Sequence, residues 1–301
     1  MRDRIGDTVR AVLRLSAARP RSMAAAALTV AVAGSVALIT GLGGSSHHAP
    51  GGAAGAQPTA AAPVRLQVVS PVGVSAREVA KLPHATTFTR IVAAPLDQDP
   101  FAVTDGLVLH SPEPQVLYAG PGKQPIGVLP ATELGSPTWV PVVQTSPGWD
   151  RVLLPSRPNR ATGWIYTAGS AGANLQIRRS QYTIRIQTGA RRLSVDDGSE
   201  SLGTWTVAVG TPGTPTPTGR TFLLALLAPP HPTYSPLILP LGFHSNVLST
   251  FGGGPGTVGL HGWPDPSVFG HAVSNGCVRV PADALHVLSG LPLGTLVVIT
   301  P

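Results

Sequence analysis

The stretch GLHGWPDPSVFGHAVSNGCVRV, residues 259–280, alternates short apolar runs with glycine and proline, a pattern typical of β-strands joined by turns. It contains the only cysteine of the chain, Cys277, sixteen positions after His261. A thiol is a useful nucleophile at neutral pH when a neighbouring group lowers its pKa or accepts its proton, and an imidazole does both. The stretch therefore predicts a cysteine–histidine catalytic pair on a β fold, although a single cysteine outside such a motif is more often a buried small hydrophobe.

The residues next to this pair suit the close approach of a substrate. Glycines flank both His261 and Cys277, and a residue without a Cβ lets backbone and substrate come near each other. The amide N–H groups of a tight Asn275-Gly276-Cys277 turn can point at one spot. We therefore expect an oxyanion hole beside the thiol.

Three separated motifs carry a family resemblance. His261-Gly262 followed by Ser274-Asn275-Gly276-Cys277-Val278-Arg279 resembles the signature of L,D-transpeptidase (YkuD-type) catalytic domains. Upstream, VAVGTPGTPTPTGRTF (207–222) is similar to the opening segment of that family, and GTLVVIT (294–300) to its terminal strand. The resemblance implies a YkuD-like β-sandwich or barrel over residues 181–301, with one or two short helices.

The resemblance also implies a role for each matching residue. Cys277 would attack the carbonyl of the third residue of a peptidoglycan donor stem, and His261 would act as the base, oriented by a backbone carbonyl near Gly262 or by a neighbouring side chain. An acceptor stem would resolve the thioester into a 3→3 cross-link, and carbapenem-type β-lactams would inhibit. The supporting and substrate-binding residues would be Ser274 for the turn, Gly262, Asn275 and Gly276 near the oxyanion, and Arg279 and His244 for the substrate.

Several residues have a simpler interpretation. Many family members have histidine where this chain has Asn275, so a second imidazole is missing from the motif. His244 could line the donor site or hold a structural place at its rim, and His271 is expected at the surface. Trp263 is expected to pack, and Asp265 between two prolines to form a turn.

Metal chemistry and phosphate binding both fit the sequence poorly. There is no second cysteine and no helical ligand pair, and the glycines of 252–256 lack the lysine that follows in a P-loop. No metal and no other cofactor is expected. The glycine-rich segment and the proline-rich stretch 228–240 are instead expected to lie near the pocket and to act as a lid.

The rest of the chain is equally poor in helix signals. Of 301 residues, 35 are glycine and 32 proline and only 12% are charged, which excludes a helical bundle. We expect an all-β module over residues 64–180, with strands at LVLH, QVLYAG, WVPVVQ, DRVLLP and GWIYTAG that resemble a bacterial SH3-like module over 107–168. Residues 64–106 extend this module or belong to a linker. One short helix is expected at 281–289, since Pro281 and Asp283 suit a first helical turn.

The N-terminus predicts export. Residues 1–22 carry six arginines and two aspartates, 23–43 form an uncharged apolar run long enough to span a bilayer, and 44–63 resemble a flexible tether. The positive-inside rule places the tail in the cytoplasm and the rest outside. A single-pass membrane anchor is favoured, and a cleaved signal peptide with secretion to the cell wall is the alternative. Most of the net charge of +7 lies in this tail, so no nucleic-acid partner is expected.

The sequence thus predicts a membrane-anchored, cysteine-dependent L,D-transpeptidase whose partners are the donor and acceptor stem peptides of peptidoglycan. An L,D-carboxypeptidase would use the same acyl-enzyme, with water in place of the acceptor. A non-catalytic wall-binding protein with a degenerate transpeptidase domain is the alternative from a different class. The retained His261 and Cys277 argue against it.

Overall fold

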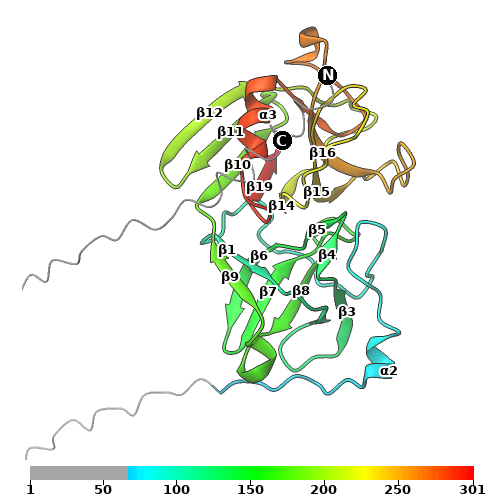
Figure 1. Cartoon of the computed structure of the whole chain (residues 1–301), viewed down its shortest axis with the longest axis vertical. Helices are drawn as coiled ribbons and strands as arrows, with labels where there is room; N and C mark the ends of the chain where they lie inside the picture. Colours follow the sequence, from blue (N-terminus) through cyan, green and yellow to red (C-terminus); the bar gives the residue numbers. More distant parts are fainter. Residues whose placement is uncertain (1–66) are drawn as a thin grey trace, which may run out of the picture. The chain divides into compact units, whose positions relative to one another are not determined.

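A computed structural model describes residues 67–301, which are mainly β with few and short helices, as the sequence predicts (Figure 1). The helices are α2 (Ala76–Val79), α3 (Ala282–Ser289) and two 3-10 turns, η1 (Gly169–Gly172) and η2 (Pro266–Val268). Within 67–301 none of these helices has the length and apolarity needed to span a bilayer. The expected basic tail, membrane segment and tether, at 1–22, 23–43 and 44–63, lie outside the described residues.

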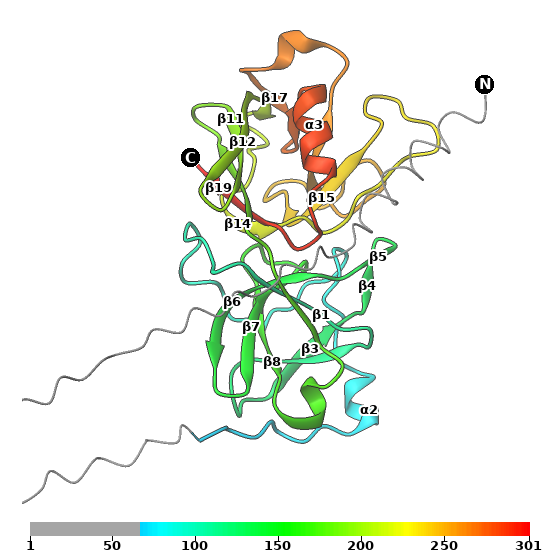
Figure 2. The ribbon, with the colours of Figure 1, turned by 60° about the vertical axis from the view of Figure 1, so that its left-hand side comes forward.

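The N-terminal module is built on a seven-stranded sheet in the order β3-β2-β8-β7-β6-β1-β9. Strands β1, β3, β6, β7 and β8 of this sheet are labelled in Figure 2. The five strands expected between 107 and 168 are all present, and β3 and the small hairpin β4–β5 are additional. The SH3-like architecture of this module stays a prediction. Its strands are β1 (Leu107–His110), β2 (Gln115–Tyr118), β3 (Pro125–Leu129), β4 (Thr132–Glu133), β5 (Ser136–Pro137), β6 (Val140–Ser146), β7 (Trp149–Leu153), β8 (Thr162–Tyr166) and β9 (Gln176–Arg179).

Residues 67–106 extend this module instead of forming a linker. Isolated β-bridges join His84, Arg90 and Leu96 of this segment to later strands and loops of the module. Ala85 and Ile91 are buried in the core of the module, because they lie beside the strands that these bridges hold in place. The segment therefore has a fixed course over the module.

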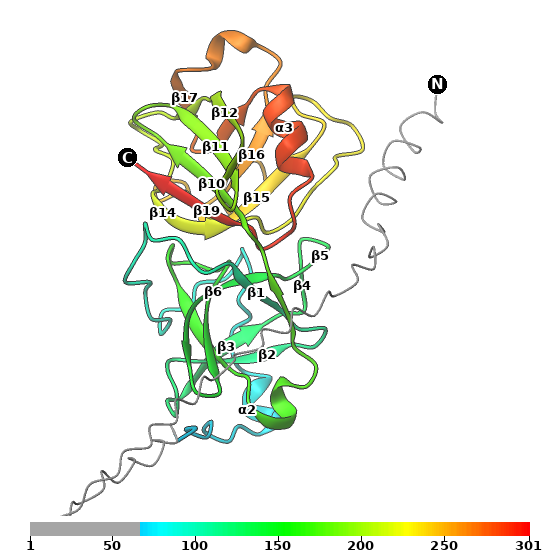
Figure 3. The same ribbon diagram turned by 90° about the vertical axis from the view of Figure 1, so that its left-hand side faces the viewer.

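The C-terminal part contains a five-stranded sheet in the order β12-β11-β10-β19-β14 and a three-stranded sheet in the order β15-β16-β18 (Figure 3). Strands β13 and β17 form a separate two-stranded sheet. The strands are β10 (Tyr182–Gln187), β11 (Arg192–Asp197), β12 (Glu200–Thr206), β13 (Val209–Gly210), β14 (Gly219–Phe222), β15 (Ile238–His244), β16 (Thr257–Gly262), β17 (Ala272–Ser274), β18 (Val278–Val280) and β19 (Leu296–Thr300).

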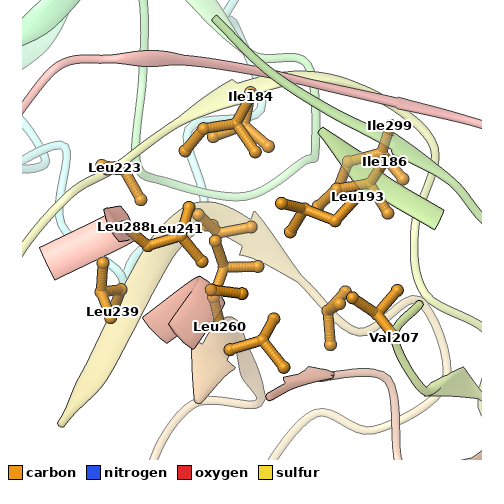
Figure 4. Close-up of a cluster of buried hydrophobic side chains, with 14 of the residues drawn as sticks. Ile184, Ile186, Leu193, Val207, Leu223, Leu239, Leu241, Leu260, Leu288 and Ile299 are labelled. Carbon is orange, nitrogen blue, oxygen red and sulfur yellow. The ribbon is translucent and has the colours of Figure 1, made fainter. Parts of the chain in front are cut away.

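Side chains of the two larger C-terminal sheets meet in one apolar cluster (Figure 4). Along β10 the buried residues Ile184 and Ile186 alternate with exposed ones, as expected for a strand with one face in a core. Helix α3 adds Leu285 and Leu288 to the same cluster, and it begins directly after Pro281, as predicted. This helix follows β18 directly, so it lies at the C-terminal end of the segment that carries Cys277.

Strand β19 is buried on both faces, because it serves two cores. Val297 and Ile299 pack into the cluster between the C-terminal sheets, while Leu296 and Val298 pack into the core of the N-terminal module. A strand with two buried faces needs an uninterrupted apolar run, which LVVI supplies. The module and the C-terminal sheets therefore share a continuous apolar contact.

Candidate active site

His261 and Cys277 are brought together by two neighbouring parallel strands. His261 lies on β16 opposite Arg279 of β18, and Leu260 lies opposite Val278. Cys277 directly precedes β18 and is two residues from Arg279, so both side chains share a face of the sheet with His261. His261, Cys277 and Arg279 line one cavity of about 470 Å³.

His261 is oriented by its own strand. The residue is 6% exposed, and its Nδ1 lies 2.8 Å from the carbonyl oxygen of Gly262. An imidazole that donates from Nδ1 keeps Nε2 available as an acceptor. Burial lowers the pKa of His261, and the charge of Arg279 acts in the same direction, while the bond to Gly262 acts against it. His261 is therefore a neutral imidazole near pH 7.

Cys277 is half-buried. Burial raises the pKa of its thiol, and a backbone hydrogen bond from Gly259 and the charge of Arg279 oppose that rise. Gly259 lies opposite Cys277 when the strand register is continued by one residue. A Cβ at Gly259 would lie 3.1 Å from the carbonyl oxygen of Leu239, so only glycine fits there without a shift of the neighbouring strand. The raised pKa makes the resting state a neutral thiol near pH 7.

A buried serine holds the turn before Cys277. The hydroxyl of Ser274 donates to the carbonyl oxygen of Cys277 at 2.5 Å and accepts from the amide of Gly276 at 3.1 Å. Gly276 adopts φ +115°, a conformation that other residues rarely reach. The amide of Gly276 is therefore used inside the turn, and an oxyanion hole at the neighbouring amides of Asn275 and Cys277 stays a prediction.

A second segment supports the same turn from outside, and sequence reasoning missed it. The hydroxyls of Thr214 and Thr216 donate to the carbonyl oxygens of Ser274 at 3.0 Å and Gly276 at 2.9 Å. Thr216 also accepts from the amide of Gly210 at 2.9 Å. The repeated threonines of TPGTPTPTG were the available signal, since each offers a hydroxyl to backbone groups.

Two aromatic residues complete the wall around His261. The Arg279 guanidinium lies 3.5 Å from the ring centroid of Trp263, a cation–π contact, so Trp263 lines the cavity instead of only packing. The ring of Tyr234 meets that of His261 edge-on, with centroids 4.8 Å apart. Tyr234 belongs to the proline-rich stretch and was not singled out from the sequence.

The structure does not bring His244 into this cavity. Its side chain is fully buried, and its Nε2 lies 2.8 Å from the carbonyl oxygen of Thr87 in the N-terminal module. The amide of His244 donates to Asn159 at 2.8 Å. Burial and the charge of Arg157 lower the pKa of His244 to about 4. The expected substrate contact is replaced by a contact between the module and the C-terminal sheets.

The remaining expectations for this region concern surface residues and loops. His271 is exposed, and Asp265 accepts from the amide of Ser267 at 2.9 Å, which makes it a turn residue. The loop at 251–255 lines the cavity as expected, and Phe251 and Gly254 close it with two backbone hydrogen bonds of 3.0 and 2.9 Å. Lid motion of this loop stays a prediction.

The N-terminal module contributes three residues to the cavity wall: Thr87, Phe88 and Leu134. Nothing in the sequence pointed to them, because they lie more than 120 residues from the nearest catalytic candidate. Within residues 67–301 no group of three or more histidine, cysteine, aspartate or glutamate side chains is placed to hold a metal ion. The site is thus built from a thiol, an imidazole, a guanidinium and a mixed wall.

Comparison with known proteins gives matches in the C-terminal part. A family model for the YkuD L,D-transpeptidase catalytic domain matches residues 181–299. The YkuD protein of Bacillus licheniformis, named as an L,D-transpeptidase, is 31% identical over 155 residues, or 50% of this chain and 86% of that protein. The YkuD protein of Bacillus subtilis is 29% identical over 119 residues, or 39% of this chain and 65% of that protein, which is less than two thirds of its length.

Among solved structures, an L,D-transpeptidase from Mycobacterium smegmatis aligns with a TM-score of 0.33 and 15% identity. The alignment covers 54% of this chain and 99% of that one. His261 and Cys277 both lie inside the range that the family model matches.

Proposed function

The chain belongs to the YkuD family of L,D-transpeptidases, and we propose that it forms 3→3 cross-links in peptidoglycan through a thioester on Cys277. One observation supports this most strongly. Cys277 and His261 line the same cavity, and Nδ1 of His261 is occupied by the carbonyl oxygen of Gly262. That arrangement leaves Nε2 to take the thiol proton.

The first half-reaction transfers an acyl group to the enzyme. His261 accepts the proton of Cys277 as the sulfur attacks the carbonyl carbon of the third residue of a donor stem. The C–N bond to the terminal D-alanine then breaks, and the leaving amine takes the proton from His261. A neutral imidazole beside a neutral thiol fits this general-base sequence, because no charge is buried before the substrate arrives.

The second half-reaction uses an amine of an acceptor stem, which attacks the thioester and gives up a proton to His261. His261 passes this proton to the departing sulfur, which restores the resting thiol of Cys277. Amides of the turn at Asn275 and Cys277 would stabilise the oxyanion in both halves. Arg279, held on the ring of Trp263, would attract the carboxylate of the terminal D-alanine.

The location of this reaction follows from the N-terminal sequence alone. We propose that the apolar run at 23–43 anchors the chain in the cell membrane, with the catalytic part outside the cytoplasm. Cleavage of that run would release the enzyme to the cell wall. Detection of the full-length chain in the membrane fraction after alkaline washing distinguishes the two.

Intact-mass spectrometry with a donor tetrapeptide stem tests the proposal. The wild-type chain is expected to gain the mass of the stem without its terminal D-alanine, and also to gain a carbapenem adduct. The Cys277→Ala variant is expected to gain neither. A β-lactam adduct retained on the Ala variant would contradict the assignment of the nucleophile.

Product analysis then separates cross-linking from hydrolysis. With an acceptor stem present, a 3→3 dimer is expected. Release of a tripeptide at the same rate with and without acceptor would show a carboxypeptidase. Binding to sacculi without any acylation of the wild-type chain would show a wall-binding protein.

A further inference from the structure

Residues of the N-terminal module form part of the cavity around Cys277, and the mechanism above does not use them. Phe88 and Leu134 line that cavity beside Thr87. Phe88 is 70% exposed, unusually high for a phenylalanine, and it stands on a turn between residues 86 and 89. An exposed aromatic side chain at the rim of a catalytic cavity is suited to contact a ligand.

The turn that carries Phe88 is fixed on two sides. The amide and hydroxyl of Thr87 both donate to one carboxylate oxygen of Glu133 at 2.9 Å, and Glu133 is buried. On the other side, the carbonyl oxygen of Thr87 lies 2.8 Å from Nε2 of His244, on strand β15 of the catalytic part. The position of Phe88 is therefore set by both parts of the chain.

Leu134 occupies a position that the local backbone does not favour. It forms, with Gly135, the two-residue loop of the β4–β5 hairpin, and both have positive φ, +49° and +76°. Such a loop favours Asn-Gly, and a leucine there costs backbone free energy. Leu134 directly follows Glu133, which binds Thr87, so the hairpin and the turn form one wall.

Charge and size indicate what this wall contacts. The strongly ionisable groups of the cavity, His261, Cys277 and Arg279, come from the catalytic sheet, whereas the wall of the module has none. A cavity of about 470 Å³ suits the end of a single peptide, and during acylation that peptide is the donor. With the terminal carboxylate at Arg279, the wall faces an uncharged part of the donor.

We infer that Phe88 and Leu134 form a subsite for the methyl- and methylene-bearing part of the donor stem, an assignment that rests on the proposed function. The N-terminal module then takes part in substrate recognition. Phe88 and Leu134 are specificity residues here, and the Thr87 contacts to Glu133 and His244 position them.

Acylation kinetics of the full chain test this inference. Phe88→Ala is expected to raise the donor tetrapeptide concentration at half-maximal acylation rate roughly tenfold, with the limiting rate unchanged. Val92→Ala is the matched control, since Val92 lies on the same segment, is 84% exposed and does not line the cavity. Iodoacetamide is too small to contact Phe88 or Leu134 while it reacts with Cys277. Its rate of alkylation is therefore expected to be equal in the wild type, Phe88→Ala and Val92→Ala.

A second variant separates contact from folding. Leu134→Asn places a favoured residue in the turn but removes the packing of Leu134 against the core of the module, so its melting temperature is expected to stay close to that of the wild type, while its donor requirement rises roughly fivefold. The inference is overturned if both Phe88→Ala and Leu134→Asn depend on donor concentration as the wild type does. It is also overturned if the variants lose iodoacetamide alkylation of Cys277 to the same extent as acylation by the donor. Either result leaves the proposed function standing. Failure of the wild-type chain to become acylated would overturn both.

Discussion

Two buried histidines on adjacent strands, His261 on β16 and His244 on β15, differ in what surrounds their ring nitrogens, and we propose a catalytic role for only the first. Burial lowers the pKa of both. His261 bonds through Nδ1 to its neighbour Gly262 and lines the cavity of Cys277. His244 bonds through Nε2 to Thr87 and lines no part of that cavity. Burial alone therefore does not distinguish the two histidines. They differ in whether the ring nitrogen that has no backbone partner belongs to a residue lining the cavity of Cys277.

The second nitrogen of His244 is enclosed by the fold. Its Nδ1 has no hydrogen-bond partner among residues 67–301, and the nearby Arg157 donates to the carbonyl oxygens of Ser245 at 2.9 Å and Pro255 at 2.8 Å. A positive guanidinium beside the ring disfavours a second positive charge. His244 is therefore a neutral part of the contact between the module and the catalytic sheets.

The largest expected difference between the two residues is in chemistry. His261→Ala removes the proton acceptor, so acylation of Cys277 by the donor stem is expected to fall by about 10²- to 10⁴-fold. The rate is measured by stopping the reaction at several times and determining the acylated fraction by intact-mass spectrometry. His244→Gln is the control, because its amide can still donate to Thr87, and it is expected to stay within a few-fold of the wild-type rate. Equal losses of acylation rate in His261→Ala and His244→Gln would contradict a catalytic role that belongs to His261 alone.

The pH dependence of stability is expected to report on His244. Its pKa is about 4 in the folded chain, against an ordinary value of 6.5 for an exposed histidine, so the unfolded chain binds more protons between these pH values. Stability is therefore expected to fall as the pH drops from 6.5 to 4, by about 3 kcal/mol from this residue. Below pH 4 the loss is complete.

Urea unfolding at several pH values measures this effect. His244→Gln is expected to flatten the slope of unfolding free energy between pH 6.5 and 4. The lowered pKa of His261 contributes with the same sign, so part of the slope remains in that variant. Identical slopes for wild type and His244→Gln would show that His244 titrates normally in the folded chain.

The sequence predicted the local part of the site and not its long-range part. The pairing of His261 with Cys277 and the helix after Pro281 were predicted from residues close together in the chain, and the carbonyl of Gly262 was one of two orienting groups that the family resemblance implied. The position of His244 does not. A buried residue on an alternating strand is predictable, but which of two cores it faces depends on pairing between distant segments.

The module's part in the site has the same cause. The contact between Thr87 and His244 spans 157 residues, and the buried ion pair between Asp97 and Arg220, at 2.7 Å, spans 123. Neither contact can be recognised from the neighbouring sequence, since each of its residues resembles an ordinary turn or strand residue in its own segment. Tyr234 was missed for the same reason, because its contact with His261 is made across a proline-rich loop.

The smallest expected effect concerns how firmly Cys277 is held opposite His261. Ser274→Ala removes two hydrogen bonds of the turn, one to the carbonyl oxygen of Cys277 and one from the amide of Gly276. Because Ser274 is buried, the loss is expected to destabilise the chain by roughly 1–3 kcal/mol. Ser289→Ala, which removes one exposed bond at the end of α3, is the matched control and is expected to cost less.

The limiting acylation rate of Ser274→Ala is expected to show whether Ser274 only stabilises the fold or also positions the thiol. If Ser274 only stabilises the fold, acylation per folded molecule is unchanged. If the turn sets the position of the thiol relative to the imidazole, Ser274→Ala lowers the limiting acylation rate severalfold while iodoacetamide still alkylates Cys277, because a small reagent reacts from many directions. We expect the second result, since both bonds of Ser274 hold the backbone next to the nucleophile and neither reaches the core. An unchanged limiting rate in the folded variant would contradict it.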